Sequence, residues 1–174
     1  MPDAAIAAAA AAMPAGAVIG HCSGATPLGA CDFSLHPLMT VPTRSHPPAR
    51  FDGVPAAVAG HPVATQLAAA LGMRPVHIAD ADRAAYHAAA CMASNFLVVL
   101  EDAAERVGAT AGLEREALTP LIRATVENWA RDGRAALTGP AARGDVATLD
   151  RHREALRTRT PDLLPLYEAM VAAC

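Results

Sequence analysis

The sequence contains no lysine, so all 14 of its basic residues are arginine. This absence excludes Schiff-base chemistry and any lysine acid or base. Aromatic residues make up only 3% of the 174 residues, whereas 53% of the chain is hydrophobic and much of that is alanine. Alanine combines the highest helix propensity with little bulk, so the composition favours closely packed helices over a thick aromatic core.

Strong charge of either sign is also missing, because the net charge is only -3. The chain therefore gives no electrostatic reason to expect a nucleic acid or an anionic membrane as a partner. The longest uncharged stretch, 84–100, contains Tyr86, His87, Ser94 and Asn95, which indicates a buried central helix and not a membrane span. The N-terminal alanine run has no basic segment before it, so we interpret it as a helix and not as a secretory signal.

Several catalytic signatures are absent. The four cysteines form no CxxC pair, and with no sign of export we expect reduced thiols in a cytoplasmic protein. There is no P-loop, HExxH or GxSxG. The nearest approach to a dinucleotide fingerprint, Gly16, Gly20, Gly24 and Gly29, has the wrong spacing and does not open a helix.

The first half of the chain, 1–79, alternates between two kinds of segment. Apolar runs at 17–20, 33–35, 54–59 and 75–78 predict strands, and 3–13 and 61–71 predict helices. Short strands interleaved with helices are typical of a mostly parallel, helix-covered sheet. We therefore expect part of a Rossmann-type sheet here, with the proline-rich segment 42–50 as a surface loop.

From residue 80 to residue 174 the pattern is helical throughout, so the chain is predicted to be α/β followed by all-α. One long helix is expected from Asp80 or Asp82 to about Val107, and a second over 114–132. A turn is expected over 138–145, with Asp145 capping the next helix. Pro161 is expected to open the last helix.

Two predicted strands end in reactive polar residues. His21-Cys22-Ser23-Gly24 follows one strand, and His36-Pro37 follows the next. Ligands of parallel α/β sheets bind outside the carboxyl ends of the strands, so Ser23 and His36 are candidate catalytic residues, and Gly24 would let a ligand approach the backbone. The alternative is that Ser23 and His36 only cap strands and bond to neighbouring loops.

The long helix carries a polar stripe. His87, Cys91, Ser94 and Asn95 recur at intervals of three and four, which places them on one helix face. Buried polar groups need partners, which would be either a substrate or other helices. His87 and Cys91 are too few to hold a metal.

Two residues further along are also candidates. Asn128 lies in the middle of a predicted helix, where asparagine is disfavoured. Arg143 follows a Gly-Pro break and could present a guanidinium fork to a carboxylate or phosphate. The alternative for Arg143 is a surface arginine on a turn.

Four ordered segments together resemble a bacterial family of Rossmann-like oxidoreductases of unestablished activity. They are 21–25 (HCSGA), 35–40 (LHPLMT), 86–95 (YH through ASN) and 136–145 (ALTGP to RGD). Members of this family join an NAD(P)-binding domain to a helical domain of unknown function, similar to the C-terminal domain of 6-phosphogluconate dehydrogenase. The resemblance covers essentially the whole chain.

The resemblance implies an activity and a set of site residues. Prephenate dehydrogenases look similar in placing a serine after one strand and a His-Pro pair after the next, where both contact the substrate hydroxyl that is oxidised. Carried over, Ser23 and His36 are catalytic, and Ser23 and Gly24 contact the cofactor, NAD or, as we expect, NADP. Substrate contacts from the helical domain would then come from His87, Ser94, Asn95, Asn128 and Arg143.

The resemblance also implies differences from its relatives. Related dehydrogenases use a lysine in the long helix, and this chain has none. Family members begin with a strand, a glycine-rich turn and a helix, and they have a Val-Pro-Asp-like segment where this chain has 1–3 (MPD). We hypothesise that Met1 is an internal codon used as a start, with roughly 80 to 100 residues upstream, so that this chain alone would not bind the cofactor in full.

The leading hypothesis is therefore an NAD(P)-dependent oxidoreductase that transfers a hydride to or from a small hydroxy or keto acid. The first alternative is a non-catalytic helical protein that serves dimerisation or binding. A second alternative is a metal-dependent hydrolase using His21, His36 and His87. Helical domains of the wider superfamily pair through their long central helix, so we expect a homodimer through residues 80–174.

Overall fold

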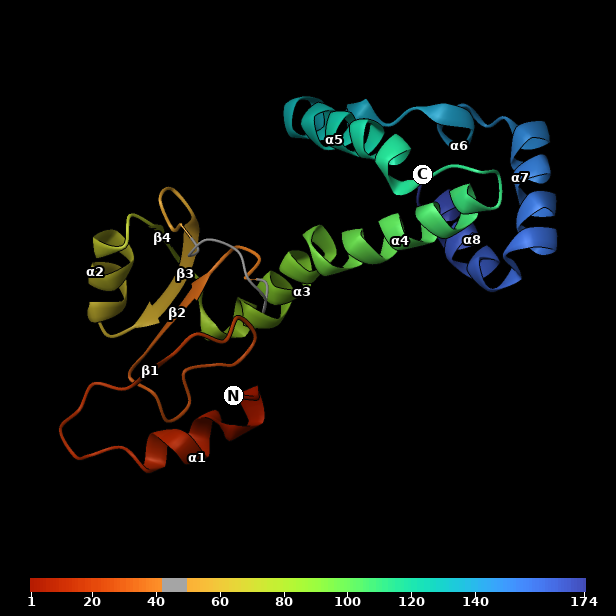
Figure 1. Cartoon of the computed structure of the whole chain (residues 1–174). Coiled ribbons are helices and arrows are strands. Elements are labelled where there is room, and N and C mark those ends of the chain that lie inside the picture. The colour runs from red at the N-terminus through yellow and green to blue at the C-terminus, as the bar shows by residue number, and fades with distance from the viewer. Residues whose placement is uncertain (42–49) are drawn as a thin grey trace. The chain divides into compact units, whose positions relative to one another are not determined.

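The computed structural model describes residues 1–41 and 50–174, and these divide into two compact units (Figure 1). The first unit comprises residues 1–96 and the second comprises residues 97–174. The proline-rich segment predicted as a surface loop lies outside the described residues, apart from Arg50. Each unit is described by itself below.

A four-stranded sheet with the order β1-β2-β3-β4 forms the centre of the first unit. β1 pairs with β2 in parallel and β3 with β4 in parallel, whereas β2 and β3 are antiparallel. The strands are β1 (Gly20–His21), β2 (Phe33–Pro37), β3 (Pro55–Gly60) and β4 (Arg74–His77). The predicted fold class, a small and mostly parallel sheet followed by a helical region, is confirmed, with one antiparallel step that the sequence did not indicate.

The antiparallel step decides which strand ends lie together. In the register of β1 and β2, Gly20 lies opposite Phe33 and His21 opposite Ser34, so both strands run the same way. Their carboxyl ends therefore share one edge of the sheet, as the strand-end prediction required. β3 and β4 run in the opposite direction and end at the other edge.

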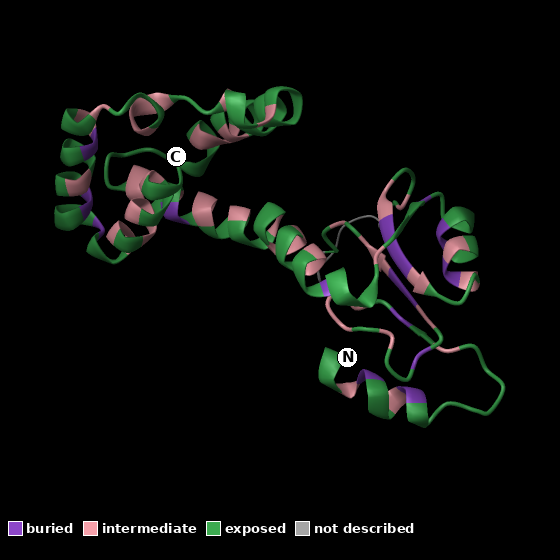
Figure 2. Cartoon of the chain, turned by 180° about the vertical axis from the view of Figure 1, so that it is seen from behind, coloured by how far each residue is buried: buried purple, intermediate pink, exposed green. Residues whose placement is uncertain are grey.

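The core of this unit is built largely from small side chains. α2 (Val63–Ala70) packs its buried Ala64 and Ala68 against the sheet, where a larger residue would hold the helix away. In Figure 2, the buried part of α2 faces the buried stretches of the neighbouring strands. The main cluster consists of Leu35, Ala56, Val58, Ala64, Ala68 and Met73. A second cluster lies under α1 (Ile6–Ala11), which follows a 3-10 turn (Asp3–Ala5), and contains Ile6, Ala10 and Cys31.

The helical run after the sheet is broken, which corrects the prediction of one continuous helix. A 3-10 turn (Asp80–Asp82) leads into α3 (Arg83–Ala93), and α4 (Asn95–Ala109) follows after Ser94. Ser94 leaves helical geometry, with φ -128° and ψ -73°, and its hydroxyl donates to the carbonyl oxygen of Ala90 at 2.8 Å. Such back-bonding by serine is associated with bent helices.

The prediction that 84–100 is buried is also wrong for this chain. Most of the stretch is exposed, and Val98 retains 69% of its accessible surface. Asp80–Ala109 is long and apolar enough to cross a membrane by length and composition, with a mean hydropathy of 1.2 over its most apolar window and none of that window buried. Several large apolar side chains of α3 and α4 are thus exposed.

The second unit contains the remaining helices. They are α5 (Arg115–Asp132), a 3-10 turn (Gly133–Ala136), α6 (Gly139–Arg143), α7 (Val146–Arg159), a 3-10 turn (Pro161–Leu163) and α8 (Leu164–Ala173). The predicted turn at 138–145 is wrong in part, because Pro140 occupies a first-turn position of the short helix α6. Asp145 caps α7 as predicted, accepting from the backbone N–H of Thr148 at 3.1 Å. α7 and α8 are joined by Arg153, which donates to both carboxylate oxygens of Glu168.

Candidate active site

Three of the predicted site residues lie together with His87 at the shared carboxyl edge of β1 and β2. Gly24 is the centre of the group. A Cβ atom added to Gly24 would lie 2.6 Å from Cδ2 of His87, 2.9 Å from Cε1 of His36 and 3.0 Å from Nε2 of His36. The two imidazoles are therefore packed over a backbone position that only glycine can occupy without displacing them. Ser23 is the neighbour of Gly24 in the chain, so the strand-end prediction brings Ser23, Gly24 and His36 to one place.

His36 has a partner that the sequence did not indicate. Nδ1 of His36 lies 2.7 Å from the hydroxyl oxygen of Tyr86 on α3, and the two rings meet edge to face. Burial lowers the pKa of His36, and the nearby His87 and Arg83 lower it further, against a smaller opposing effect of Asp3. Burial raises the pKa of Tyr86. Both side chains are consequently neutral near pH 7.

The hydroxyl of Ser23 is already engaged. It donates to Oδ2 of Asp3 at 2.6 Å, and it accepts from the backbone N–H of Thr26 at 3.0 Å. The hydrogen bond from Ser23 is the main reason that the pKa of Asp3 is lowered, which keeps this carboxylate ionised. Asp3 was not among the predicted site residues, because a contact across 20 residues leaves no spacing signal in the sequence.

A buried arginine supports the loop that carries Ser23. Arg83, the first residue of α3, is only 1% exposed. Its guanidinium donates to the Ser23 carbonyl oxygen at 3.2 Å, to Oδ1 of Asp80 at 3.1 Å and to the hydroxyl of the fully buried Ser34. The Asp80 carboxylate in turn accepts from the backbone N–H of Leu28. The (i, i+3) spacing of Asp80 and Arg83 was the one sequence signal that could have identified this pair.

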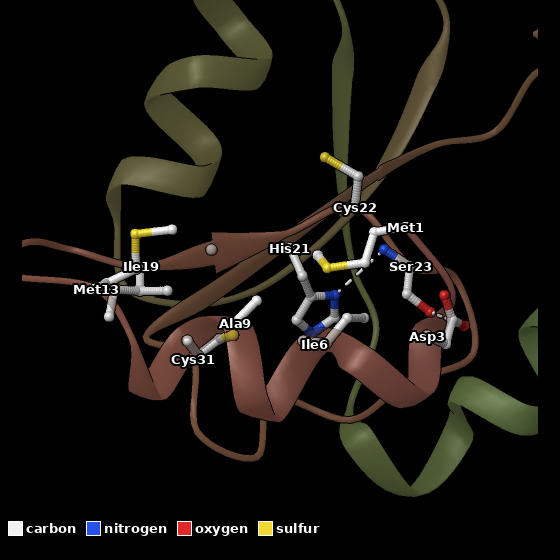
Figure 3. A pocket seen from close by; sticks show the side chains of 12 residues that line it. Met1, Asp3, Ile6, Ala9, Met13, Ile19, His21, Cys22, Ser23 and Cys31 are labelled. Atoms are coloured by element: carbon white, nitrogen blue, oxygen red, sulfur yellow. Dashed lines mark hydrogen bonds between the residues drawn. The ribbon is translucent and has the colours of Figure 1, made fainter.

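A cavity of about 420 Å³ opens between α1 and β1, next to Ser23 (Figure 3). Asp3 and Ser23 lie at one end of it, and His21 lies in the middle. Burial lowers the pKa of His21, whose Nε2 lies 3.2 Å from the Pro27 carbonyl oxygen. The remaining lining is mostly apolar: Met1, Ile6, Ala9, Ala10, Met13, Ile19, Gly20, Cys22 and Cys31.

The predicted polar stripe on the long helix is divided by the break. His87 and Cys91 lie on α3, with Nδ1 and Sγ 3.8 Å apart. Ser94 is the breaking residue itself and bonds to Ala90 and Asn95, so its hydroxyl is used within the helix. Asn95 is exposed at the start of α4. Of these four residues the structure brings His87 to the site and shows no contact of Ser94 or Asn95 with it.

Asn128 and Arg143 belong to the second unit. Asn128 is exposed on α5, where its side-chain oxygen accepts from Arg131 at 3.0 Å. Arg143 is exposed at the end of α6, before Gly144 in the left-handed conformation. Their assignment as substrate-binding residues stays a prediction. In the part of the chain that the structure describes, no group of three or more His, Cys, Asp or Glu side chains has the arrangement of a metal site.

Comparison with known proteins finds a matching protein family and solved structures of similar fold. Residues 52–174 match a protein family described as a domain of unknown function, DUF2520. The fold is similar to that of protein TM1727 from Thermotoga maritima, with a TM-score of 0.78 and 25% identity over 99% of this chain and 74% of that one. It is also similar to BF3122 from Bacteroides fragilis, named as a "putative NADP oxidoreductase", with a TM-score of 0.83 and 22% identity over 99% of this chain and 72% of that one. No curated protein matches the chain.

Proposed function

We infer the function of this chain, which belongs to the family of the domain of unknown function DUF2520, from the residues of its own site. We propose that it is an NADP-dependent oxidoreductase that transfers a hydride to or from a small hydroxy or keto compound. The structural similarity to a protein named as an NADP oxidoreductase supports the cofactor class. Ser23, Gly24 and His36 are the residues proposed to contact the cofactor and the reacting group.

The observation that carries this proposal is the position of the His36 ring. Its Nε2 edge packs against Gly24, and the His87 ring packs against the same side of that glycine, with the centroids of the two rings 6.1 Å apart. This arrangement stands at the carboxyl edge of two parallel strands, where α/β sheets bind their ligands. A neutral imidazole placed there can form a hydrogen bond with the oxygen of an alcohol or a carbonyl.

The role that we propose for Ser23 is contact with the cofactor and not proton transfer by its hydroxyl. Because Asp3 and Thr26 hold that hydroxyl, Ser23 is fixed in one orientation and Asp3 adds a negative charge beside it. We infer that Ser23 and Gly24 form the surface against which the nicotinamide ring rests, while His36 faces the substrate oxygen. Asp3 then serves to hold Ser23 in place.

The residues of this chain fit the cofactor in part. The largely apolar cavity beside Ser23 suits a flat ring. The sequence offers no glycine-rich turn for the pyrophosphate. When bound, the nicotinamide supplies or accepts the hydride. The side chains of this protein are proposed to orient the substrate oxygen and to hold a proton beside it.

Consumption of NADPH with a panel of small keto acids and ketones tests this proposal, and reduction of NADP with the matching alcohols tests the reverse reaction. His36→Asn should lower kcat/KM by roughly 100-fold, the lower range for loss of a positioned acid or base. His152→Asn is a matched control, because His152 also pairs with a tyrosine hydroxyl, at 2.8 Å from Tyr167, but lies on the second unit. Equal activity of the His36→Asn protein and wild type would contradict the proposal.

A second candidate function, assembly without catalysis, is favoured by the large apolar side chains that are exposed on α3 and α4. They are Met92, Phe96, Val98 and Val99. Exposed apolar patches of this kind mark interaction sites. We propose that a second copy of the chain covers them, so that the protein is a homodimer through these helices whether or not it is an enzyme.

A lipid bilayer is a poorer partner for the same helices. The run is interrupted at Ser94, and a break in helical hydrogen bonding is costly in hydrocarbon. Its amino-terminal end is also tied to the sheet by the buried Arg83, which bonds to Ser23 and Ser34. These two features support a partner helix over a membrane.

A further inference from the structure

Tyr86 and His36 form a hydrogen bond between α3 and β2, 50 residues apart in the chain. The oxygen of Tyr86 and Nδ1 of His36 are 2.7 Å apart, a short distance for a neutral pair. The rings are nearly perpendicular, at 87°, with centroids 5.6 Å apart. The contact therefore fixes the rotation of the imidazole as well as its position.

The direction of this hydrogen bond follows from the protonation of its two partners. Burial raises the pKa of Tyr86 and lowers that of His36, so a phenol faces a neutral imidazole. A neutral imidazole carries one N–H and one bare nitrogen. A phenol is the stronger donor and the bare imidazole nitrogen the stronger acceptor, so the Tyr86 hydroxyl donates to Nδ1. The single ring proton of His36 is then on Nε2.

The other nitrogen of the ring is directed at the candidate site. Nε2 lies 3.0 Å from the point where a Cβ on Gly24 would be, and no described group forms a hydrogen bond with it. The His87 ring packs against the same point, so the two rings together cover Gly24. With the proton on Nε2, His36 presents an N–H donor at the carboxyl edge of β1 and β2.

The charged side chains near His36 restrict the kind of ligand that can bind beside Nε2. Among the described residues, Arg83 is the arginine whose charge acts on His36, and it is buried and donates to Ser23, Ser34 and Asp80, so it is not available to a carboxylate or phosphate. Asp3 is an ionised carboxylate on the same edge, which disfavours an anion. The charges of the described residues therefore favour an uncharged hydrogen-bond acceptor beside Nε2.

We propose that Tyr86 is a positioning residue that holds the proton of His36 on Nε2, so that His36 donates a hydrogen bond to the carbonyl oxygen of an aldehyde or ketone bound at the carboxyl edge of β1 and β2. The inference deepens the proposed function and rests on it for the identity of the ligand. It assigns the neutral oxygen of the substrate, and not a carboxylate or phosphate, to this edge of the sheet.

The tautomer is tested directly by nitrogen NMR of the histidine-labelled protein without ligand, at a pH above about 7. The two ring nitrogens of His36 should give one protonated and one bare signal, with the proton on Nε2. Tyr86→Phe removes a single oxygen and should bring the two tautomers to comparable populations. Tyr167→Phe, which removes the similar hydroxyl beside His152, should leave His36 unchanged. A wild-type proton on Nδ1, or a Tyr86→Phe spectrum identical to wild type, would overturn the proposal.

A kinetic measurement separates this inference from the proposed function. With NADPH and a neutral aldehyde or ketone, Tyr86→Phe should lower kcat/KM by roughly 10-fold with the KM for NADPH unchanged, while Tyr167→Phe has no effect. The expected NMR result without turnover by any variant would support the role of Tyr86 and refute the oxidoreductase. Turnover that Tyr86→Phe leaves intact would support the oxidoreductase and refute the role of Tyr86.

Discussion

The carboxylate of Asp3 accepts a hydrogen bond of 2.6 Å from the hydroxyl of Ser23, which joins the start of the chain to the loop after β1. This bond fixes the serine that we propose to contact the nicotinamide. Asp3→Ala should therefore raise the KM for NADPH by roughly 5-fold, which corresponds to about 1 kcal/mol, the typical net contribution of one hydrogen bond. Asp102→Ala removes an exposed acidic residue on α4 and serves as the control. Equal KM values for wild type and Asp3→Ala would show that Ser23 needs no such support.

Gly24 is predicted to tolerate no side chain. In Gly24→Ala the new Cβ would be 2.6 Å from the His87 ring and 2.9 Å from the His36 ring, so both must move. Activity should fall by at least 10-fold, and overpacking should destabilise the fold by roughly 1–3 kcal/mol. Urea unfolding and steady-state kinetics measure the two effects.

Gly108→Ala provides the matched comparison. Gly108 lies near the end of α4, and a Cβ there would be 3.4 Å from its nearest neighbour, an ordinary contact. Alanine is the better helix former, so this variant should be as stable as wild type or more stable by up to about 1 kcal/mol. Similar losses in both variants would show that the effect at Gly24 is not caused by the two histidines.

Arg83→Met should destabilise the first unit. The substitution keeps most of the apolar stem but leaves the buried Ser34 hydroxyl and the Ser23 carbonyl without their donor. One buried group without a partner costs roughly 1–3 kcal/mol, so the free energy of unfolding should fall by about 2 kcal/mol. Arg115→Met, which breaks an exposed pair with Glu105, should have little effect. An unchanged midpoint for Arg83→Met would refute the supporting role of this arginine.

Stability should fall as the pH is lowered below about 6.5, the ordinary pKa of histidine. The folded protein holds His21 and His36 with lowered pKa values, mainly because they are buried. In this pH range the unfolded chain takes up protons that the folded chain does not, so acid favours unfolding. The effect is absent above the ordinary pKa and grows until the pH reaches the lowered values.

The slope of stability against pH identifies the histidines responsible. Urea unfolding at about pH 7 and about pH 5 measures it. His36→Gln should flatten the slope, and the double variant with His21→Gln should flatten it further. A wild-type slope in the double variant would mean that groups other than His21 and His36 control the acid response.

The apolar face of α3 and α4 predicts a dimer. Phe96→Glu places a charge on this face and should convert the dimer to a monomer in analytical ultracentrifugation. Val146→Glu is a control of the same kind, because Val146 is exposed at the first turn of α7 and accepts an acidic residue well. A monomeric wild-type protein would contradict the proposed interface.

Much of the fold could be predicted from the sequence because its signals are local. The apolar runs predicted the positions of β2, β3 and β4 to within one or two residues. The predicted end of the helix over 114–132 agrees with the end of α5, and Asp145 caps the start of α7 as predicted. The antiparallel step between β2 and β3 had no local signal, since strand direction depends on how the connection crosses the sheet. Ser94 broke the long helix through a side-chain bond that helix periodicity does not register.

The part of the candidate site that lies at the carboxyl ends of parallel strands could be predicted from the sequence, because ligands of α/β sheets bind there. Ser23 and His36 come to the same edge because Ser23 follows β1 and His36 lies near the end of the adjacent parallel strand β2. Tyr86, Asp3 and Arg83 were missed because they come from other elements and meet the strand ends only in three dimensions. Tyr86 was hidden in particular by its neighbour His87, since adjacent helix residues are not expected to serve one site.

The most direct test of the central claim is to map where NADP binds on the labelled protein by NMR. Titration with NADP should shift the amide signals of Ser23 and Gly24 and the ring signals of His36, and leave the ring of His152 unchanged. Shifts confined to residues 97–174, or none at millimolar NADP, would contradict the assignment of this strand edge as the cofactor and substrate site.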